Sequence, residues 1–578
     1  MSRNISKQAF LAAALLTASG LYAQVAPTDA GSALRENKKA PQLPTSLTPP
    51  VSVQAAPSPN QAITTSDPKE VRIYVRRYIV PANSAVTQGE VDLATSDYTR
   101  RWLTFTQIRA GFDCVRELYR SKGYVLANTY SPEQTMKDGI IKLGVLEGIV
   151  EGVDVKKTAG SGTSISADAV RDRITAAQSV GAAFRVQDAE RGLLIASDLV
   201  KSPVTAQLSA GKAMGATRVD IEFTPPPAAS ATLSYDNFGN KQSGRNRAQF
   251  EGRFTTGLVE GDEIDLGYTH ASDLQSIRGG LSLPIGSNGL TAGLSYSDVS
   301  YDLSGDFTGF SGTAKELRVN ASYPFMRSRS FSFFGDLIYS LRDLENTDVT
   351  GNTFPRTLDS YTLGGRIESY DDGLGGGMNQ VSLNFVAGSS TVDNRAVDIL
   401  GRYLDSQLAR GAEGSYSKVV LTASRLQHVT DTATMLFSLR VQQSSDNLDS
   451  SEQDSLGGPY GLRSYANSEA TGDKTTVLSV ELRQPLFTGF SAKVFFDQGW
   501  VKVSNDNAWD TSNAINSYSL HSAGVGLDLN NSLFGMPIRA SVTYAHSVGD
   551  NPALSAQGLD AEGSTATDRL WFQLEARF

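Results

Sequence analysis

The last eleven residues, DRLWFQLEARF (568–578), alternate strictly between two kinds of side chain. Every second position from the first phenylalanine onward is apolar: Phe572, Leu574, Ala576 and Phe578. The positions between them carry Gln573, Glu575 and Arg577. Successive side chains of an extended chain point to opposite faces, so this pattern predicts a β-strand with one apolar and one polar face.

The same alternation recurs upstream, for example in ATMLFSLRVQQ (433–443) and TTVLSVELRQPL (475–486). From residue 228 to residue 578 we find strand-like segments separated by turn clusters and no helical period, and we count 16 strands. Lipid-facing apolar residues that alternate with lumen-facing polar ones, on an even number of strands, are typical of an outer-membrane barrel. A β-helix or a sandwich is the alternative, but about 350 residues exceed an ordinary sandwich. We therefore predict a 16-stranded antiparallel transmembrane β-barrel over 228–578.

Residues 69–227 have a different, mixed α/β character. VRIYVRRYIV (71–80) alternates like a strand, and the segment 107–125 repeats apolar residues at helical spacing. Ile108, Phe112, Val115 and Tyr119 share one face of that helix. A second cycle of helices and strands follows, and a run of three prolines at 225–227 ends it. We predict two similar small α/β units, over 69–149 and 150–227.

The N-terminus predicts export from the cytoplasm. Residues 1–23 combine a basic start with a short apolar segment, as in a secretory signal peptide. Residues 24–68 are rich in Pro, Ala, Ser and Thr and predict an extended linker. A short helix around 33–39 is possible there, but no long amphipathic helix suited to plugging a pore is evident. The single Cys114 excludes an internal disulfide framework, and a net charge of −9 gives no support for nucleic-acid binding.

A loop and a strand near the C-terminus form a candidate site. By strand count, residues 446–474 are the sixth external loop, and they include GGPYGLRSYANSEATGDK (457–474). In the strand VFFDQGW (494–500), the apolar Phe496 and Trp500 suit lipid, so Asp497 should face the lumen. If the loop folds inward, Arg463 can pair with that carboxylate. The simpler alternative is a solvated loop arginine and an ordinary lumen acid, and spacing alone favours it.

The order of these segments and three local motifs resemble the outer-membrane transporters of two-partner secretion, the TpsB proteins of haemolysin-activator type. GYVLANTYSPEQTMKDGIIKLGVLEG (123–148) is similar to the family's first POTRA domain. GGPYGLRSYANSEATGD resembles the inward-folding loop with its VRGY-type signature, and FFDQGW resembles the F-x-D-x-G strand signature. The loop departs from the signature at Leu462 and Ser464, where the family has Val and Gly, and a positive φ at Ser464 would strain the turn.

The resemblance implies a set of functional residues. It favours pairing of the loop with the barrel wall through a loop–barrel latch of Arg463, Tyr465, Asp497 and Gly499, in which the glycine lets the loop backbone approach the wall. It also implies two periplasmic POTRA domains that receive an unfolded exoprotein by strand addition. Apolar grooves beside the helix of the first domain, at Phe112, Val115 and Tyr119, would bind that substrate.

The resemblance further implies a transporter rather than an enzyme. The barrel would lie in outer-membrane lipid and conduct a large secreted partner of TpsA type, without nucleotide or cofactor. His270, His428, His521 and His546 show no metal-ligand spacing, and the glycine-rich DGLGGGM (372–378) lacks a Walker lysine. An assembly factor for other outer-membrane proteins, for which more POTRA units are expected, and a passive porin are the alternatives.

Overall fold

The computed structural model describes residues 27–37, 53–54, 71–82, 84–136, 138–158, 162, 165–398, 401–510, 514–555 and 557–578. The predicted signal peptide and most of the predicted linker lie outside these ranges. No helix of the described part of the chain is both long and apolar enough to cross a membrane.

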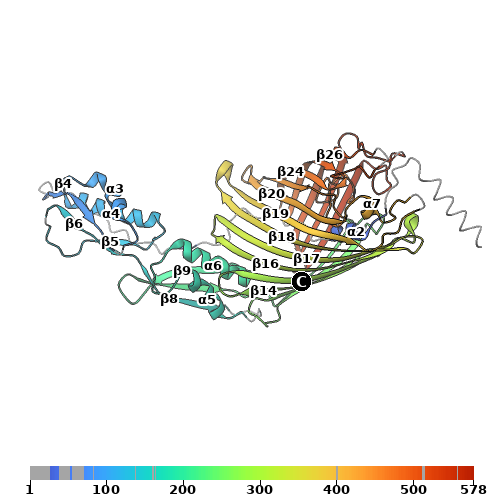
Figure 1. The fold of residues 1–578 in the computed structure, drawn as a ribbon. Helices are drawn as coiled ribbons and strands as arrows, with labels where there is room; N and C mark the ends of the chain where they lie inside the picture. Colours follow the sequence, from blue (N-terminus) through green and yellow to red (C-terminus); the bar gives the residue numbers. More distant parts are fainter. Residues whose placement is uncertain are drawn as a thin grey trace, which may run out of the picture.

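The C-terminal part of the chain is a closed barrel of sixteen antiparallel strands, which confirms the predicted fold (Figure 1). Each strand pairs with its neighbour in sequence, and the last strand pairs with the first, with Leu233 opposite Ala576. The strands are β11 (Ala229–Asp236), β12 (Arg247–Phe254), β13 (Glu263–His270), β14 (Leu274–Ile285), β15 (Leu290–Asp302), β16 (Ser311–Arg327), β17 (Phe331–Thr347), β18 (Thr353–Asp371), β19 (Gly377–Val392), β20 (Gly414–His428), β21 (Thr434–Ser444), β24 (Lys474–Phe487), β25 (Phe490–Lys502), β26 (Ser517–Leu533), β27 (Met536–Ser547) and β28 (Asp568–Arg577).

Alternating burial along these strands separates a lipid face from a lumen face. On β25, Val494, Phe496 and Trp500 are exposed on the outer surface, whereas Asp497 between them is completely buried. On β24, Leu478 is exposed and Glu481 is buried. Because the side chains of a strand alternate between its faces, the apolar positions cover the outside of the barrel and the polar ones face inward. The predicted orientation of Asp497 is therefore confirmed.

Residues 71–146 form a first α/β unit, which we call the first unit. It contains β2 (Ile73–Val75), β3 (Arg77–Ile79), α3 (Gln88–Ala94), β4 (Arg101–Leu103), α4 (Phe105–Ser121), β5 (Asn128–Tyr130), β6 (Ile140–Lys142) and β7 (Gly144–Leu146). A capping box at Thr104 and Gln107 begins α4. The apolar face of α4 packs onto the strands, with Val115 and Tyr119 in the core beside Tyr78.

Residues 149–223 form a second α/β unit, which we call the second unit. Its helices α5 (Ala167–Ala177) and α6 (Val186–Val200) pack on a sheet of β8 (Ile149–Lys157), β9 (Thr205–Ala210) and β10 (Ala216–Phe223). A two-residue strand from the linker, β1 (Val53–Gln54), completes the sheet in the order β1-β9-β10-β8.

The second unit sits against one end of the barrel, and the first unit extends away from it (Figure 1). Asp198 on α6 pairs with Arg327 at the end of β16, at 2.8 Å. Arg191, on the same helix, donates to the carbonyl of Pro324 at 2.9 Å. Lys201 after the helix pairs with Glu263 of β13. These contacts join the second unit to strand ends and turns of the barrel.

A short helix, α2 (Ala30–Glu36), lies inside the barrel; it overlaps the short helix considered around 33–39, although the sequence showed no long helix suited to plugging a pore. Ala30, Ala33 and Leu34 pack against residues of the barrel interior, among them Leu274 and Tyr301. The side chain of Asp29 caps the helix by accepting from the backbone of Ser32. Seven residues are too few to show a helical period, and so short a helix is stable only through its tertiary contacts. The sequence pattern therefore gave little signal for it.

Candidate functional site

Residues 445–473, between β21 and β24, fold into the barrel; we call this segment loop 6. The eleventh strand ends at Ser444, close to the predicted position, and loop 6 returns to the wall at Lys474. Two short strands, β22 (Asp454–Ser455) and β23 (Thr471–Gly472), pair within the loop. Loop 6 and the wall share a buried apolar cluster of Leu456, Leu462, Tyr465, Ala470, Val477, Val501 and Leu520.

Arg463 of loop 6 meets Asp497 of the barrel wall. Its Nε and Nη2 donate to the two carboxylate oxygens of Asp497 at 3.0 and 2.8 Å, which is a bidentate arrangement. Its backbone N–H also donates to Asp497, at 3.2 Å. The Asp497 side chain has no exposed area, and that of Arg463 is 11% exposed. The structure therefore brings together the two residues that the motifs singled out.

Sequence reasoning missed the further partners of Arg463. Nη1 pairs with Glu481 of β24, and Nη2 donates to Ser479 at 3.0 Å. The guanidinium carbon lies 3.3 Å from the centre of the Phe495 ring, a cation–π contact. The signal was present in the strand 475–486, where Ser479 and Glu481 share the polar face, but nothing in the sequence indicated the register that places them beside the loop.

Loop 6 is also held by backbone contacts around Arg463. The indole N–H of Trp571, near the end of the chain, donates to the carbonyl of Arg463 at 2.6 Å. The backbone N–H of Ser464 donates to Ser522 at 3.0 Å. Ser464 does not have a positive φ, so the serine at this position causes no backbone strain. The departure from the family's glycine is therefore compatible with the turn.

Two further predicted residues lie in the same contact. A Cβ added at Gly499 would stand 2.9 Å from methyl carbons of Leu456 and of Leu462, so only glycine permits this close approach of the loop. Tyr465 is 7% exposed and belongs to the apolar cluster between loop and wall. All four predicted latch residues thus lie at the loop–barrel contact.

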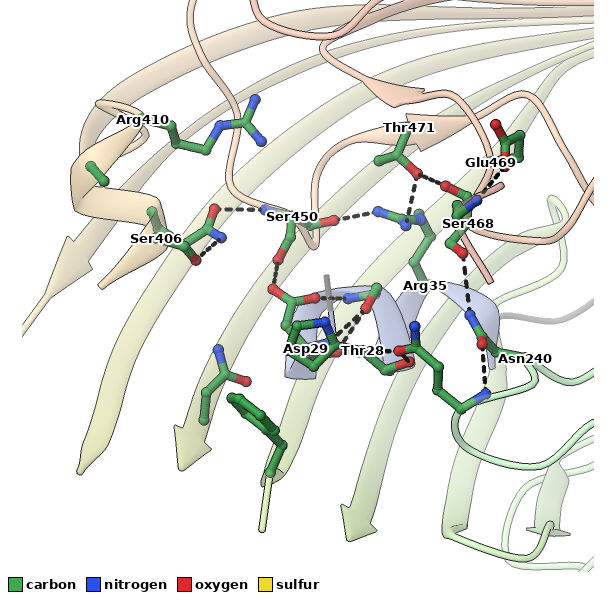
Figure 2. A pocket seen from close by; sticks show the side chains of 18 of the residues that line it. Thr28, Asp29, Arg35, Asn240, Ser406, Arg410, Ser450, Ser468, Glu469 and Thr471 are labelled. Atoms are coloured by element: carbon green, nitrogen blue, oxygen red, sulfur yellow. Dashed lines mark hydrogen bonds between the residues drawn. The ribbon is translucent and has the colours of Figure 1, made fainter. Parts of the chain in front are cut away.

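Helix α2 is fixed to both the wall and loop 6 through Arg356 of β18, whose side chain is fully buried. Its guanidinium is 2.6 Å from Asp449 of loop 6 and 3.3 Å from Asp29 at the start of α2. Ser450 donates to the Asp29 carboxylate as well (Figure 2). Burial opposes ionisation of Asp29, but Arg356 and the hydrogen bonds from Ser450 and Ser32 lower its pKa below the ordinary value. One arginine therefore joins wall, helix and loop.

The far end of α2 has polar contacts but no ion pair among the described residues. Arg35 donates to the carbonyl of Ser450 at 2.6 Å (Figure 2). Glu36 accepts from Asn240 at 3.4 Å, and no cation pairs with its carboxylate among the described ion pairs. Burial raises the pKa of Glu36 to about 7, despite the opposing charge of Arg35.

A cavity of about 690 Å³ lies between α2, loop 6 and the neighbouring external loops (Figure 2). Polar residues such as Thr28, Ser32 and Asn240 line it together with aromatic ones such as Tyr301 and Trp509. On this side the two elements that fill the lumen are thus separated by an open cavity of mixed polar and apolar lining rather than by continuous packing.

The first unit corrects the predicted substrate groove. Val115 and Tyr119 have no exposed area, so they form the core of the folded unit and cannot touch a substrate; Phe112 is half-buried against the same core. Exposed aromatic residues lie on the paired strands β2 and β4, and also at the start of α4 (Phe105) and on β5 (Tyr130). Tyr74 is 42% and Trp102 is 64% exposed, and their rings meet edge to face at 5.7 Å. Helical periodicity identified the inward face of α4 but not what lies against it.

Comparison with known proteins identifies the first unit as a separate domain. Residues 73–148 match the model of the POTRA domain of ShlB type. The chain is 23% identical over 496 residues to the outer membrane transporter CdiB of Escherichia coli O6:K15:H31, with 81% of this chain and 80% of that protein covered. It is 22% identical over 476 residues to the heme/hemopexin transporter protein HuxB of Haemophilus influenzae, with 80% of each covered.

Solved structures share the fold. CdiB from Escherichia coli superposes with a TM-score of 0.70 at 20% identity, covering 90% of this chain and 94% of that one. CdiB from Acinetobacter baumannii gives 0.64 at 13% identity, covering 99% and 98%. The match to outer membrane transporters and the POTRA match at residues 73–148 place the barrel in the outer membrane and the POTRA region in the periplasm. Residues 215–529, more than half of the chain, match the family model itself, so this chain belongs to the haemolysin secretion/activation protein family ShlB/FhaC/HecB.

Proposed function

We propose that this chain secretes one large partner exoprotein, in unfolded form, across the outer membrane. The observation that carries the proposal is the construction of the lumen. The wall is a closed sheet, whereas α2 and loop 6, which fill it, are fixed by side-chain contacts: ion pairs and hydrogen bonds around Arg356 and Arg463, and apolar packing against the wall. An unfolded chain can pass once these two elements move, and the sheet need not open.

The proposed domains follow the sequence prediction. They are a signal peptide (1–23), a linker (24–68), a first POTRA domain (69–149), a second POTRA domain (150–227) and the barrel (228–578) with the in-folded loop 446–474. The α/β architecture of the second unit and its packing on the barrel end support its assignment as a POTRA domain. In that position it would pass the arriving exoprotein to the lumen.

We assign loop 6 the role of a gate held by the loop–barrel latch. Arg463, Asp497 and Gly499 fix one position of the loop, and Tyr465 seals the apolar contact beside them. A buried ion pair gives little net stability, but it specifies geometry, because losing either partner leaves the other charge buried and unpaired. The passing exoprotein would have to break this contact, and the contact would form again after passage.

The first unit offers a receiving surface on β2 and β4. Tyr74 and Trp102 are flanked by the exposed arginines Arg72, Arg76 and Arg100. Aromatic and arginine side chains contribute strongly to protein recognition, so this surface suits an extended segment with apolar and acidic residues. We propose it in place of the α4 groove.

The proposed activity is transport and not catalysis. It uses no nucleotide, metal or other cofactor, and folding of the exoprotein outside the cell supplies the drive. The partners are the exoprotein and the surrounding outer-membrane lipid; nucleic acid is not among them.

The test is deletion of the gene in its own host, followed by quantitative proteomics of the medium and the outer membrane. We expect one large protein to disappear from the medium and to return with the wild-type gene. Depletion of many barrel proteins from the outer membrane would identify an assembly factor instead. An unchanged proteome in both fractions would contradict both functions and leave a passive pore.

A further inference from the structure

Several cations on the inner wall of the barrel pair with carboxylates of the wall itself. Arg247 of β12 is 2.8 Å from Asp236 of β11. Lys493 of β25 is 2.8 Å from Asp528 of β26. Both partners of each pair belong to the closed sheet, so these charges stay compensated whatever fills the lumen.

Three cations on β18, β20 and β21 are compensated differently. Each pairs with a carboxylate of loop 6: the pairs are Arg356–Asp449 at 2.6 Å, Lys418–Glu452 at 2.6 Å and Arg440–Asp454 at 3.1 Å. Among the ion pairs of the described residues, none of the three cations contacts a carboxylate of another barrel strand. Departure of loop 6 therefore leaves a row of uncompensated positive charge on this part of the wall.

Arg342 of β17 shows the contrast. It also pairs with Glu452 of loop 6, but its Nε donates to Glu316 of β16 at 2.7 Å. Arg342 thus keeps a carboxylate of the wall when the loop leaves. We call the three cations without such a partner, Arg356, Lys418 and Arg440, the cationic track.

The carboxylates on the track come from one short stretch of loop 6, residues 446–454, which we call the acidic segment. Its sequence, DNLDSSEQD, has four carboxylates in nine residues and no basic residue, and the rest is Asn, Ser, Gln and one Leu. A polypeptide of this composition buries too little apolar surface to fold on its own. The acidic segment therefore has the chemistry of an unfolded acidic chain that lies against the wall.

The contact is suited to an exchange of partners. Loss of one partner from a buried ion pair is costly, because the remaining charge is uncompensated. A carboxylate from a passing chain restores the same kind of pair, so the wall can change partners with little change in free energy. Charge-assisted pairs also discriminate, because a basic side chain at the same place is repelled.

The opposite side of loop 6 does not balance the track. When Arg463 leaves, Glu481 keeps the guanidinium of Arg483 at 2.7 Å, and Asp497 keeps the hydroxyl of Ser479 at 2.7 Å. Only Asp497 of these two acids then lacks a cation. Three free cations against one free carboxylate make this part of the emptied lumen positive.

We infer that the cationic track is the contact surface for the exoprotein inside the lumen, and that the acidic segment occupies it at rest as an internal stand-in for the substrate. This inference rests on the proposed function and gives the class of its substrate. The exoprotein carries stretches with a carboxylate at every second or third residue and few basic residues. The spacing follows that of Asp449, Glu452 and Asp454 on the wall.

The test breaks the same two ion pairs from either side. Lys418→Gln/Arg440→Gln removes charge from the track, whereas Glu452→Gln/Asp454→Asn loosens loop 6 equally and leaves the track charged. Each variant replaces the gene in the deletion strain, and heat-modifiable migration of the outer-membrane protein verifies the folded barrel. We expect the first variant to release at least fivefold less of the secreted protein than the parent, and the second to release at least as much as the parent.

A variant that keeps the charges controls for packing. Lys418→Arg/Arg440→Lys should restore release to within twofold of the parent, since the track needs positive charge at these places rather than one side chain. Equal release from the two charge-removing variants would show that the pairs only hold loop 6, and it would overturn the track. Low release from the Lys418→Arg/Arg440→Lys variant would overturn it as well.

A peptide probe tests the track without the exoprotein. The purified protein carries Arg463→Ala to free loop 6, together with Glu452→Gln and Asp454→Asn, and its open states are recorded in planar bilayers. The probes are a synthetic peptide of residues 446–454 and the same peptide with amides in place of its four carboxylates. We expect the acidic peptide to block the current at a concentration at least tenfold lower, and to lose this advantage in 1 M salt. Equal block by the two peptides would refute recognition of carboxylates.

Failure of the track and failure of the proposed function give different results. If deletion of the gene costs the host no secreted protein, the proposed function is wrong, and the track as a substrate contact is wrong with it. If one secreted protein is lost but the two charge-removing variants release it equally, the transporter stands and only the track is refuted.

Discussion

Replacing Arg463 by alanine should open loop 6 by a predictable amount. The change leaves Asp497, which has no exposed area, without its bidentate partner. Removing one partner of a buried pair costs about 3–5 kcal/mol. Two contacts limit the loss here: Ser479 still donates to Asp497 at 2.7 Å, and Arg483 still donates to Glu481 at 2.7 Å. We therefore expect the low end, about 3 kcal/mol, which corresponds to about a 100-fold larger open population.

Thiol labelling measures that population. Ser464 is 2% exposed, so a cysteine placed there in the Cys114→Ser background reacts with a thiol reagent only when loop 6 leaves its seat. We expect Arg463→Ala to accelerate labelling about 100-fold. Arg483→Ala is the matched control, because this half-exposed arginine contacts Glu481 but not loop 6, and it should change the rate less than threefold. A rate for Arg463→Ala within threefold of the parent would refute the latch.

Three further outcomes follow from the same contacts. Gly499→Ala forces a Cβ against two leucines of loop 6, so it should speed Ser464→Cys labelling about tenfold, corresponding to ~1–2 kcal/mol, and Leu462→Ala should partly reverse the effect. Arg356→Ala leaves the buried Asp449 and the partly exposed Asp29 without their shared cation, so planar-bilayer recordings should show openings at least tenfold more often than in the parent; equal opening would contradict a role in seating α2. Because the pKa of Glu36 is raised, its protonated carboxyl stabilises the seated helix at low pH. This contribution is lost as the pH rises towards about 7, so openings should become more frequent from pH 5 to pH 8 in the parent but not in Glu36→Gln.

The barrel was predictable from sequence because its signal is local and repeated. Each strand shows period-two alternation on its own, as in residues 433–443, and sixteen repetitions leave little room for another fold. Counting strands then located loop 6, and the alternation alone predicted that the Asp497 side chain faces inward. The contact between Arg463 and Asp497 needed the motif as well, because loop residues carry no periodicity.

What the sequence could not predict depends on tertiary packing. The residues AGSALRE of α2 have weak helical signal, and the helix forms because Arg356, Ser450 and the apolar wall hold it. The apolar stripe of α4 was identified correctly, but the same pattern serves a substrate groove and a buried core, and only the packed unit shows that Val115 and Tyr119 belong to the core. Glu481 was on the expected face, yet its contact with Arg463 depends on the register between strand and loop.

The central claim, that the exoprotein travels through this lumen, is tested most directly by photo-crosslinking inside the barrel. Positions 319 and 320 are neighbours on β16: Val319 is exposed on the lipid face, whereas Asn320 shares the inward face of the buried Glu316. A photoreactive residue at each position, activated in cells during secretion, should form an adduct with the secreted protein from position 320 and not from position 319. Adducts from neither position, or equally from both, would contradict passage through the lumen.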